Sequence, residues 1–194
     1  MGVVSPDKEK ETYSLNDREL LSRYLKGDVS AFEALLDRYE KPLLRFAARY
    51  RVGNGADRAR DIVQEVFLKL LSKAGGLRNQ ENLSPWLYRV ARNLAIDEKR
   101  RESRMDKYQR AAAVPEIEPA PVSQAERQEI AQIINRKLHG LPPNQRDVLI
   151  LKIQEGKSYR EISQITGLTT SNIGYLIHHG LKRLSGELRK VGVI

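Results

Sequence analysis

Residues 158–184 read SYREISQITGLTTSNIGYLIHHGLKRL, and this stretch decides how the C-terminal part of the chain folds. Ser158 is placed to cap a short helix, and Thr169 or Thr170 is placed to cap a longer helix that follows. Gly167 lies between the two predicted helices, where the chain must turn sharply. Two capped helices joined by a glycine turn predict a helix-turn-helix.

The apolar residues of this stretch recur at helical spacing, where two crossing helices would pack against each other. They are Ile162, Ile165, Leu168, Ile173 and Ile177. The start and outer face of the second helix carry polar side chains that can reach base edges or phosphates of DNA. These are Thr170, Ser171, Asn172, Tyr175, His178, His179 and Lys182. An ordinary helical hairpin is the alternative, but the coincidence of caps, turn glycine and apolar spacing favours DNA binding.

The rest of the chain also predicts helices. Gly and Pro are sparse inside the long segments, and no stretch shows a sustained alternation of apolar and polar residues. We therefore expect an all-α fold. In chain order, the predicted helices span about residues 18–26, 29–51, 56–73, 86–104, 124–138, 144–154, 159–165 and 171–189.

Capping and helix-breaking residues set the expected boundaries. Asn16 or Asp17 can cap the first helix, and Ser84 followed by proline predicts the start of the fourth. The glycine pair at positions 75–76 is expected to stop the third helix. Pro42 falls inside the second helix and is expected to kink it.

A proline-rich segment divides the chain into two helical blocks. Residues 111–123 contain Pro115, Pro119 and Pro121 among small residues without periodicity, which is typical of a linker. The expected parts are an N-terminal tail at 1–16, a first domain at 17–104, a linker at 105–123 and a second domain at 124–190.

The composition is that of a folded protein with a basic surface. Of the 194 residues, 40% are hydrophobic and 30% charged, and 34 Lys and Arg against 25 Asp and Glu give a formal net charge of +9. A basic excess favours a polyanionic partner such as nucleic acid. No apolar run approaches the roughly 20 residues that cross a bilayer, and the polar N-terminus lacks a signal-peptide core. We therefore expect a cytoplasmic protein without membrane insertion.

The residue inventory excludes several kinds of site. The chain has no cysteine, which excludes disulfides, thiolate metal sites and cysteine nucleophiles. Its three histidines are His139, His178 and His179, and the adjacent pair points about 100° apart on a helix, so a shared metal ion is not expected. We expect no metal, no cofactor and no catalytic residues.

The predicted helix at 86–104, WLYRVARNLAIDEKRRESR, combines aromatic residues with cations. Trp86 and Tyr88 can stack on or wedge against unpaired bases. The cations, which can hold phosphates, are Arg89, Arg92, Lys99, Arg100, Arg101 and Arg104. Alternatively, Trp86 belongs to the core together with Val90 and Leu94. For the whole basic helix beside a polar loop, nucleic-acid contact is favoured.

Residues 61–67, DIVQEVF, form an amphipathic pattern in the third predicted helix. Asp61, Gln64, Glu65 and Leu68 fall near one another on one face, at spacings of three and four. By itself the pattern is common and assigns no function. A catalytic carboxylate pair is conceivable, but no strand framework, metal-ligand set or phosphate loop accompanies it in the sequence.

Taken in this order, the segments resemble an extracytoplasmic-function (ECF) sigma factor, an alternative sigma factor of bacterial RNA polymerase. The resemblance covers about residues 17–188, with sigma region 2 in the first predicted domain and region 4 in the second. The matching motifs are GDVSAFEALLDRYEKPL at 27–43, DIVQEVFLKLL at 61–71, WLYRVARNLAIDEKRR at 86–101, LPPNQRDVLIL at 141–151 and the helix-turn-helix.

The resemblance implies a non-catalytic initiation factor that binds core RNA polymerase and directs promoter-specific transcription. In the family, the helix that matches residues 61–71 docks on the clamp helices of the β′ subunit. The implied contact residues are Asp61, Gln64, Glu65, Phe67 and Leu68. Region 4 would also contact the flap of the β subunit.

The resemblance also implies contacts with promoter DNA. Residues 76–83 match the family loop that captures an unstacked base of the −10 element, and residues 86–101 match the helix that melts and reads it. The −10 candidates are Arg78, Asn79, Trp86, Arg89, Asn93, Asp97 and Arg100. Residues 170–182 would enter the major groove at the −35 element. Many family members carry several arginines there, whereas residues 172–179 of this chain are nearly neutral.

Family members are commonly inhibited by an anti-sigma factor, so the resemblance implies such a partner as well. Other protein classes remain as alternatives: a helix-turn-helix repressor or activator, an enzyme acting on nucleic acid, and a helical adaptor that binds only protein. The sequence has no obvious dimerisation helix or effector domain for the first, and no catalytic constellation for the second.

Overall fold

The computed structural model of the chain describes residues 12, 14–50, 55–105 and 122–191. Every regular element within these ranges is a helix, which confirms the all-α fold expected from the sequence. The helices belong to two compact units, Met1–Gln109 and Arg110–Ile194. Most of the expected tail at 1–16 and of the expected linker at 105–123 lies outside the described residues.

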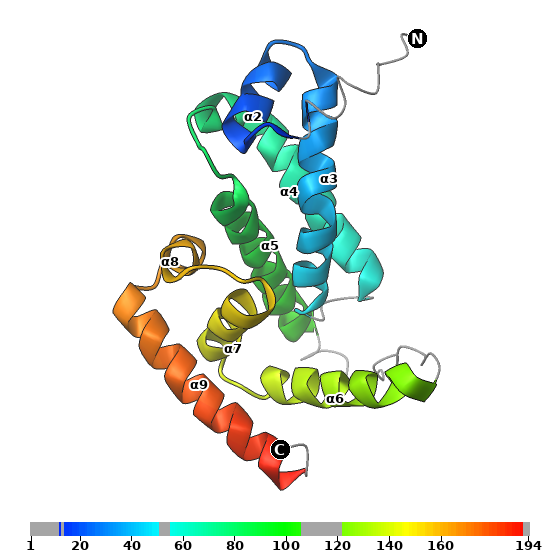
Figure 1. The fold of residues 1–194 in the computed structure, drawn as a ribbon, viewed down its shortest axis with the longest axis vertical. Coiled ribbons are helices and arrows are strands. Elements are labelled where there is room, and N and C mark those ends of the chain that lie inside the picture. Colours follow the sequence, from blue (N-terminus) through cyan, green and yellow to red (C-terminus); the bar gives the residue numbers. More distant parts are fainter. Residues whose placement is uncertain (1–11, 13, 51–54, 106–121, 192–194) are drawn as a thin grey trace. The chain divides into compact units, whose positions relative to one another are not determined.

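The described part of the first unit consists of four helices: α2 (Asp17–Leu25), α3 (Val29–Ala48), α4 (Ala56–Leu77) and α5 (Ser84–Met105). α3, α4 and α5 pack against one another, and α2 packs against α3 and α4 (Figure 1). Leu35, Phe46, Leu70 and Leu87 come from three of these helices and are all 0% exposed. Their burial supplies the hydrophobic stabilisation of this unit.

The start of α2 is determined by its own residues. Asn16 Oδ1 accepts a hydrogen bond from the Glu19 backbone N–H at 2.9 Å, and the Asn16 N–H donates to Glu19 Oε2 at 3.0 Å. This capping box satisfies two backbone donors at the helix end. Of the two residues expected to cap α2, Asn16 is therefore the one that does so. The side chain of Asp17 is buried instead.

Two boundaries in the first unit differ from the prediction. Gly75 and Gly76 do not stop α4, which continues through them to Leu77. Ala74 and Leu77 are buried, so their packing outweighs the roughly 1 kcal/mol that each glycine costs inside a helix. α5 begins at Ser84 itself, so this residue is the first of the helix and does not precede it as a cap.

α3 contains a proline in its interior. The helix runs through Pro42 and ends at Ala48, although proline has no N–H to donate to the carbonyl one turn earlier. Leu43 and Phe46, just beyond the proline, are both 0% exposed, so tertiary packing holds the helix together there. The last residue of the predicted helix, at position 51, lies outside the described residues.

The second unit contains α6 (Val122–His139), α7 (Pro143–Leu149), the π-helical turn η1 (Ile150–Gln154), α8 (Tyr159–Thr166) and α9 (Thr170–Lys190). α9 packs against α6, α7 and α8 (Figure 1). At Gly180, on α9, an added Cβ would lie 3.0 Å from Leu149 Cδ1. The absence of a side chain at this position therefore allows α9 to approach α7 closely.

The helix predicted at 144–154 is not regular along its length. After α7 the chain widens into η1, and the Glu155 N–H donates to the Ile150 carbonyl at 3.1 Å. Residues 146–151 are all buried, whereas residues 152 and 153, inside η1, are exposed. A wider turn of this kind depends on the packing around it, and the hydrophobic pattern does not encode it.

The helix-turn-helix has the expected caps. Ser158 Oγ accepts from the Glu161 N–H at 3.2 Å, and the Ser158 N–H donates to Glu161 Oε2 at 2.8 Å, which forms a second capping box. Gly167 ends α8 with a φ angle of 77°, a left-handed conformation that suits glycine. Thr169 caps α9, accepting from the Asn172 N–H at 3.3 Å.

Candidate functional site

α9 has one face in the core and one face in solvent. Its buried residues include Ile173, Ile177, Leu184 and Leu188. The residues predicted to contact a −35 element all lie on the exposed surface: Thr170, Ser171, Asn172, Tyr175, His178, His179 and Lys182. The sequence pattern therefore assigned the two faces of this helix correctly.

The turn before α9 is held by side-chain hydrogen bonds. Ser163 Oγ donates to the Leu168 carbonyl at 2.6 Å, and Thr166 Oγ1 accepts from the Leu168 N–H at 3.3 Å. Ile162 and Ile165 on α8 are buried, as predicted, while Leu168 is half-buried. A turn anchored in this way presents the first residues of α9 in one defined orientation.

The exposed face of α9 is rich in hydrogen-bonding groups and poor in charge. The rings of Tyr175 and His179 lie 4.1 Å apart between centroids, and those of His178 and His179 lie 5.4 Å apart. Tyr175 is 60% exposed, so this ring cluster projects into solvent. Hydroxyl, amide and imidazole groups are the kinds that read base edges in a DNA groove.

α5 presents a second polar stripe. The exposed residues Arg89, Asn93, Asp97 and Arg100 follow one another at spacings of three and four, and Trp86 at the start of the stripe is half-buried. The predicted −10 residues of this helix therefore share one face. Asp97 and Arg100 form an ion pair at 3.6 Å on it.

The buried face of α5 is not the one that the alternative prediction gave, in which Trp86, Val90 and Leu94 belong to the core. Leu87, Tyr88 and Ala91 are buried, whereas Trp86, Val90 and Leu94 are only half-buried. Tyr88 is 2% exposed and packs 4.9 Å from Phe46 between ring centroids, so the expectation that it stacks on bases is wrong for this structure. Trp86 keeps part of its surface in solvent.

The loop at residues 78–83 connects α4 to α5, and we call it the 78–83 loop. Arg78 and Asn79, the predicted −10 residues of this loop, are exposed, as are the next three residues. The Gln80 N–H donates to the Leu77 carbonyl at 2.9 Å, which forms a turn at the start of the loop. Leu83 at its other end is 0% exposed. The loop therefore has an exposed tip between two buried ends.

α4 exposes most of the residues predicted to bind polymerase. Asp61, Gln64 and Leu68 lie in solvent and Glu65 is half-buried. Leu68 is 53% exposed, so an apolar side chain stands among the polar ones on this surface. Phe67 is 7% exposed and its ring lies 6.3 Å from that of Phe32, so it belongs to the core.

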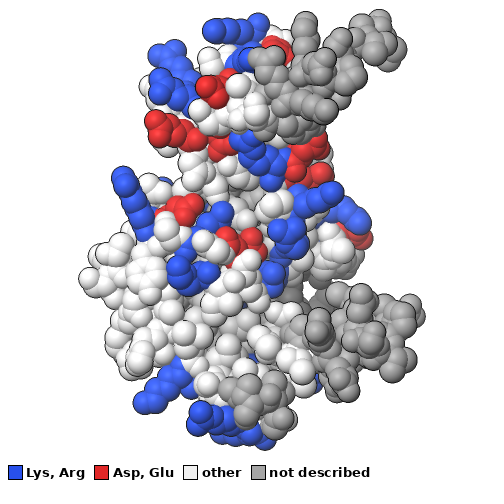
Figure 2. Space-filling model, in the orientation of Figure 1, with Lys and Arg blue, Asp and Glu red and all other residues white. Residues whose placement is uncertain are grey.

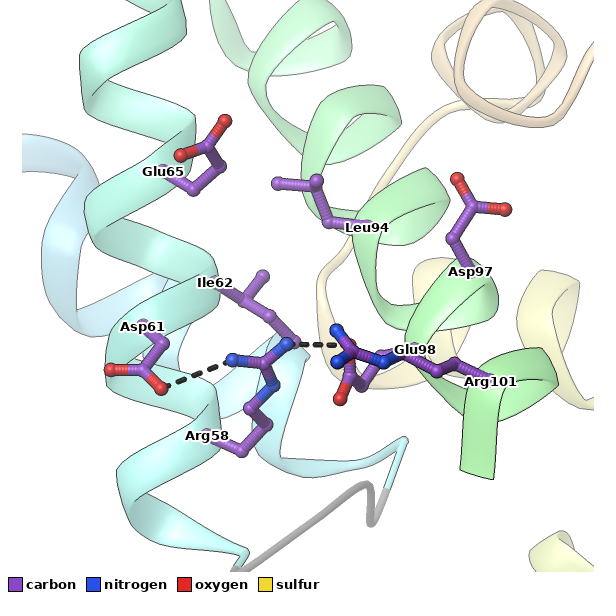
Figure 3. A pocket seen from close by; sticks show the side chains of 8 residues that line it. All are labelled: Arg58, Asp61, Ile62, Glu65, Leu94, Asp97, Glu98 and Arg101. Carbon is purple, nitrogen blue, oxygen red and sulfur yellow. Dashed lines mark hydrogen bonds and ion pairs between the residues drawn. The ribbon is translucent and has the colours of Figure 1, made fainter. Parts of the chain in front are cut away.

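A pocket between α4 and α5 lies beside this surface. Arg58 spans it: Nη1 donates to Asp61 Oδ2 at 3.2 Å and Nη2 donates to Glu98 Oε2 at 2.5 Å (Figure 3). The hydrogen bond to Glu98 raises the pKa of Arg58 above its ordinary value, so the guanidinium stays charged. The pocket is lined by Arg58, Asp61, Ile62, Glu65, Leu94, Asp97, Glu98 and Arg101.

On the face shown in Figure 2, the cations of the described residues do not gather in a single patch. Lys and Arg side chains are distributed over the face shown in Figure 2, over both units. Among the described residues, no group of three His, Asp or Glu side chains converges as a metal site would require. None of the described helices combines the length and the apolar character of a membrane span.

Two family models match the chain. Sigma-70 region 2 matches residues 35–105, which include α4, the 78–83 loop and α5. Sigma-70, region 4 matches residues 131–184, which include the helix-turn-helix. The two matches thus contain the exposed surfaces of both units described above.

Curated relatives match over most of their length. The ECF RNA polymerase sigma-E factor of Escherichia coli strain K12 is 32% identical over 162 residues, which are 78% of this chain and 83% of that protein. The chain belongs to the ECF family of RNA polymerase sigma factors. A second relative, the ECF RNA polymerase sigma factor SigW of Bacillus subtilis strain 168, is 27% identical over 184 residues, which are 89% of this sigma factor and 96% of SigW. As a member of the family, the chain acts in promoter-directed transcription initiation.

Solved structures share the fold of this sigma factor. CnrH, in a complex with the cytosolic domain of CnrY, matches with a TM-score of 0.68 and 22% identity, over 90% of this chain and 97% of CnrH. The sigma factor RpoE of Bartonella quintana, in a complex with the anti-sigma factor NepR, matches with a TM-score of 0.63 and 22% identity, over 81% of this chain and 96% of that chain.

Sequence reasoning missed two residues that organise the surfaces of this sigma factor. Arg58 holds Asp61 from the same helix, and the three-residue spacing of that pair was visible in the sequence. Its other partner, Glu98, lies 40 positions away and carried no signal. Asp17 was considered only as a helix cap, but its carboxylate accepts hydrogen bonds from residues 21, 22 and 66 positions away.

Proposed function

We propose that this sigma factor binds core RNA polymerase and selects promoters by contacting the −10 element with its first unit and the −35 element with its second. The observation that carries the proposal is that both segments matched by the sigma family models expose most of their predicted contact residues, on α4, the 78–83 loop and α5 in the first unit and on α9 in the second. The proposed division follows the boundaries expected from the sequence, with region 2 at 17–104, a linker at 105–123 and region 4 at 124–190.

The −35 element would be read by α9. The support is its solvent face, in which Thr170, Ser171 and Asn172 stand at the N-terminal end that a recognition helix directs toward the bases. Tyr175, with the two histidines that follow it, extends that face by one turn. Lys182 would contact a phosphate. Because the face is nearly neutral, hydrogen bonds to base edges would contribute more to binding than phosphate contacts do.

The −10 element would be opened and read by α5 and the 78–83 loop. Extracting a base from the duplex costs a few kcal/mol, and contacts to the single strand must compensate this cost. The exposed residues Arg89, Asn93 and Arg100 offer cations and an amide along one stripe for this purpose. Arg78 and Asn79 lie at the loop and are the residues that would meet a captured base.

Core polymerase would dock on α4. Asp61, Gln64 and Leu68 form an exposed patch in which an apolar side chain is flanked by polar ones, which is the composition of a protein interface. We propose that the clamp helices of the β′ subunit bind this patch, with Glu65 at its edge. Phe67 is left out of the patch because it lies in the core. The flap of the β subunit is the proposed partner of the second unit.

An anti-sigma factor is a further proposed partner. The support is that the solved RpoE that shares this fold is in a complex with the anti-sigma factor NepR. A sigma factor works on RNA polymerase and promoter DNA, so we propose the cytoplasm as its location. No catalysis by the chain itself is part of this proposal.

Run-off transcription with purified core RNA polymerase tests the proposed function. We expect promoter-specific transcripts from a promoter library only when the protein is added, and the transcripts would reveal the two elements. Binding to core polymerase without any transcript would replace the proposal with an inhibitor or adaptor function. Binding to promoter duplex without any effect on polymerase would replace it with a conventional regulator.

A further inference from the structure

Asp17 is a buried charged residue that joins three segments of the first unit. It is the first residue of α2 and is 4% exposed. Its Oδ1 accepts from Arg38 Nη1 at 2.7 Å, and its Oδ2 accepts from the Tyr39 hydroxyl and, at 2.7 Å, from the backbone N–H of Leu83. One carboxylate therefore connects α2, α3 and the end of the 78–83 loop.

The bond to Leu83 holds the loop where it enters α5. The Leu83 carbonyl accepts the first hydrogen bond of α5, from the Leu87 N–H at 2.9 Å, while its own N–H donates to Asp17. Leu83 is 0% exposed, so without Asp17 this N–H would be buried and would lose its hydrogen-bond partner. The backbone at the end of the loop is thus tied to the core by a charge-assisted hydrogen bond.

The other partners of Asp17 keep its carboxylate in place. Arg38 also donates to the Leu15 carbonyl at 2.7 Å, so the guanidinium braces the chain just before α2. Burial raises the pKa of the Tyr39 hydroxyl, and the hydrogen bond to Asp17 raises it further. The hydroxyl therefore remains a donor at physiological pH. None of these groups is needed to cap α2, because Asn16 does that.

We propose that Asp17 is a positioning residue for promoter opening: it holds the 78–83 loop in the shape that captures an unstacked base of the −10 element. This inference rests on the proposed function of the loop. An apolar side chain would occupy the site with a smaller desolvation cost than a carboxylate. It would leave the Leu83 N–H without an acceptor, and the exposed tip of the loop would lose one of its two anchors.

The test is a double-mutant cycle in which one change is Asp17→Asn and the other is an abasic site in the promoter. Holoenzyme is assembled from core polymerase and the full chain, on a promoter obtained by run-off transcription. Each non-template base of the −10 element is replaced in turn by an abasic site, and open-complex formation is measured. An amide has one acceptor oxygen in place of two, so it cannot satisfy all three donors that face the carboxylate. Tyr39→Phe is the matched control, because it removes a different donor to the same carboxylate and leaves the Leu83 bond.

We expect Asp17→Asn to lower open-complex formation on the intact promoter by about tenfold, the order expected when one charge-assisted hydrogen bond is lost. We call the factor by which an abasic site lowers open-complex formation the abasic penalty. At one −10 position this penalty should be at least about threefold smaller in Asp17→Asn than in the wild type, since coupled contacts are not additive. The penalties at other positions, the affinity for core polymerase, and every abasic penalty in Tyr39→Phe should stay unchanged.

Equal abasic penalties in the wild type and Asp17→Asn would overturn the proposal, because Asp17 would then support only the fold. If Asp17→Asn fails to fold by circular dichroism, an ester in place of the amide that joins Asn82 to Leu83 removes the Leu83 N–H, and the abasic penalty must then fall by the same factor. An unchanged penalty in the ester variant also overturns the proposal. If the wild-type holoenzyme itself gives no promoter-specific transcript, the proposed function fails and this inference falls with it.

Discussion

The exposed surface of the first unit of this sigma factor and the proposed DNA face of the second carry charge in different ways. The surface of the first unit carries several ion pairs, which join Asp57 to Arg60 at 2.8 Å, Glu65 to Lys69 at 3.0 Å and Asp97 to Arg100 at 3.6 Å. The proposed DNA face of the second carries hydroxyl, amide and aromatic groups, with Lys182 as its cation.

The difference indicates what each surface can recognise. Paired charges of both signs suit a surface that binds a protein at α4 and a DNA strand at α5. A charged group of either partner can replace one member of an ion pair. A nearly neutral face gains little from counterion release, so its binding depends on hydrogen bonds to particular bases. We therefore expect the first unit to dominate the salt dependence of promoter binding, and the second to contribute sequence preference.

The largest expected effect separates the two faces of α9. Ile173 is 0% exposed, and Ile173→Ala should destabilise the second unit by about 2–4 kcal/mol through lost burial and a cavity. Hydrogen exchange of α9 amides measures this unit separately. The control Asn172→Ala, at an exposed position, should cost less than about 0.5 kcal/mol. Equal losses in the two variants would contradict the assignment of the faces.

The next largest effect is expected from substitutions in the charged stripe of α5. Arg89→Ala combined with Arg100→Ala should weaken open-complex formation by roughly thirtyfold and reduce the salt slope by about 1.4, as two contacts to a single strand predict. Titration of holoenzyme with promoter at several salt concentrations measures both. Arg60→Ala is the control, because Arg60 is a 70% exposed side chain on α4 outside the stripe. A slope that does not change in the double variant would remove these cations from the DNA contact.

Substitutions in the proposed polymerase-binding patch on α4 should lower the affinity for core polymerase and leave the DNA contacts intact. Asp61→Ala combined with Gln64→Ala should lower affinity for core polymerase by about tenfold without unfolding, since both side chains are exposed. Fluorescence anisotropy with purified core polymerase measures the affinity, and circular dichroism monitors the fold. Asp57→Ala removes a 74% exposed acid on the same helix and serves as the control. The same affinity in the double variant and the control would mean that the patch lies elsewhere.

The smallest effect concerns the cation of the neutral face. Lys182→Ala should weaken binding to −35 duplex by about threefold and make the salt slope shallower by about one, as the loss of one phosphate contact predicts. Lys190→Ala is the control, because Lys190 ends α9, is 72% exposed and pairs with Glu187 at 2.7 Å. If Lys190→Ala changes the slope as much as Lys182→Ala, the two units would not differ in the way proposed here.

The sequence by itself determined the helices, most of their starts and the family. The cap at Ser158 was predicted, and the caps at Asn16 and Thr169 were each predicted as one of two neighbouring candidates, because each donor and acceptor pair lies within three residues along the chain. The two faces of α9 were predictable because its apolar residues recur with the period of a helix. The motifs that match the sigma family lie in these same local segments.

The tertiary structure alone decided which side chains of those helices remain available. α5 has the expected period, but its core face includes Tyr88, which the sequence pattern suggested for stacking on bases. On α4, Phe67 lies in the core, although the family resemblance implied a polymerase contact for it. α4 passes through its glycine pair because Ala74 and Leu77 are buried. The bonds from Arg58 to Glu98 and from the Leu83 N–H to Asp17 join residues 40 and 66 positions apart. Such contacts arise only when the helices pack, because the energy of a hydrogen bond depends on distance in space and not on separation along the chain.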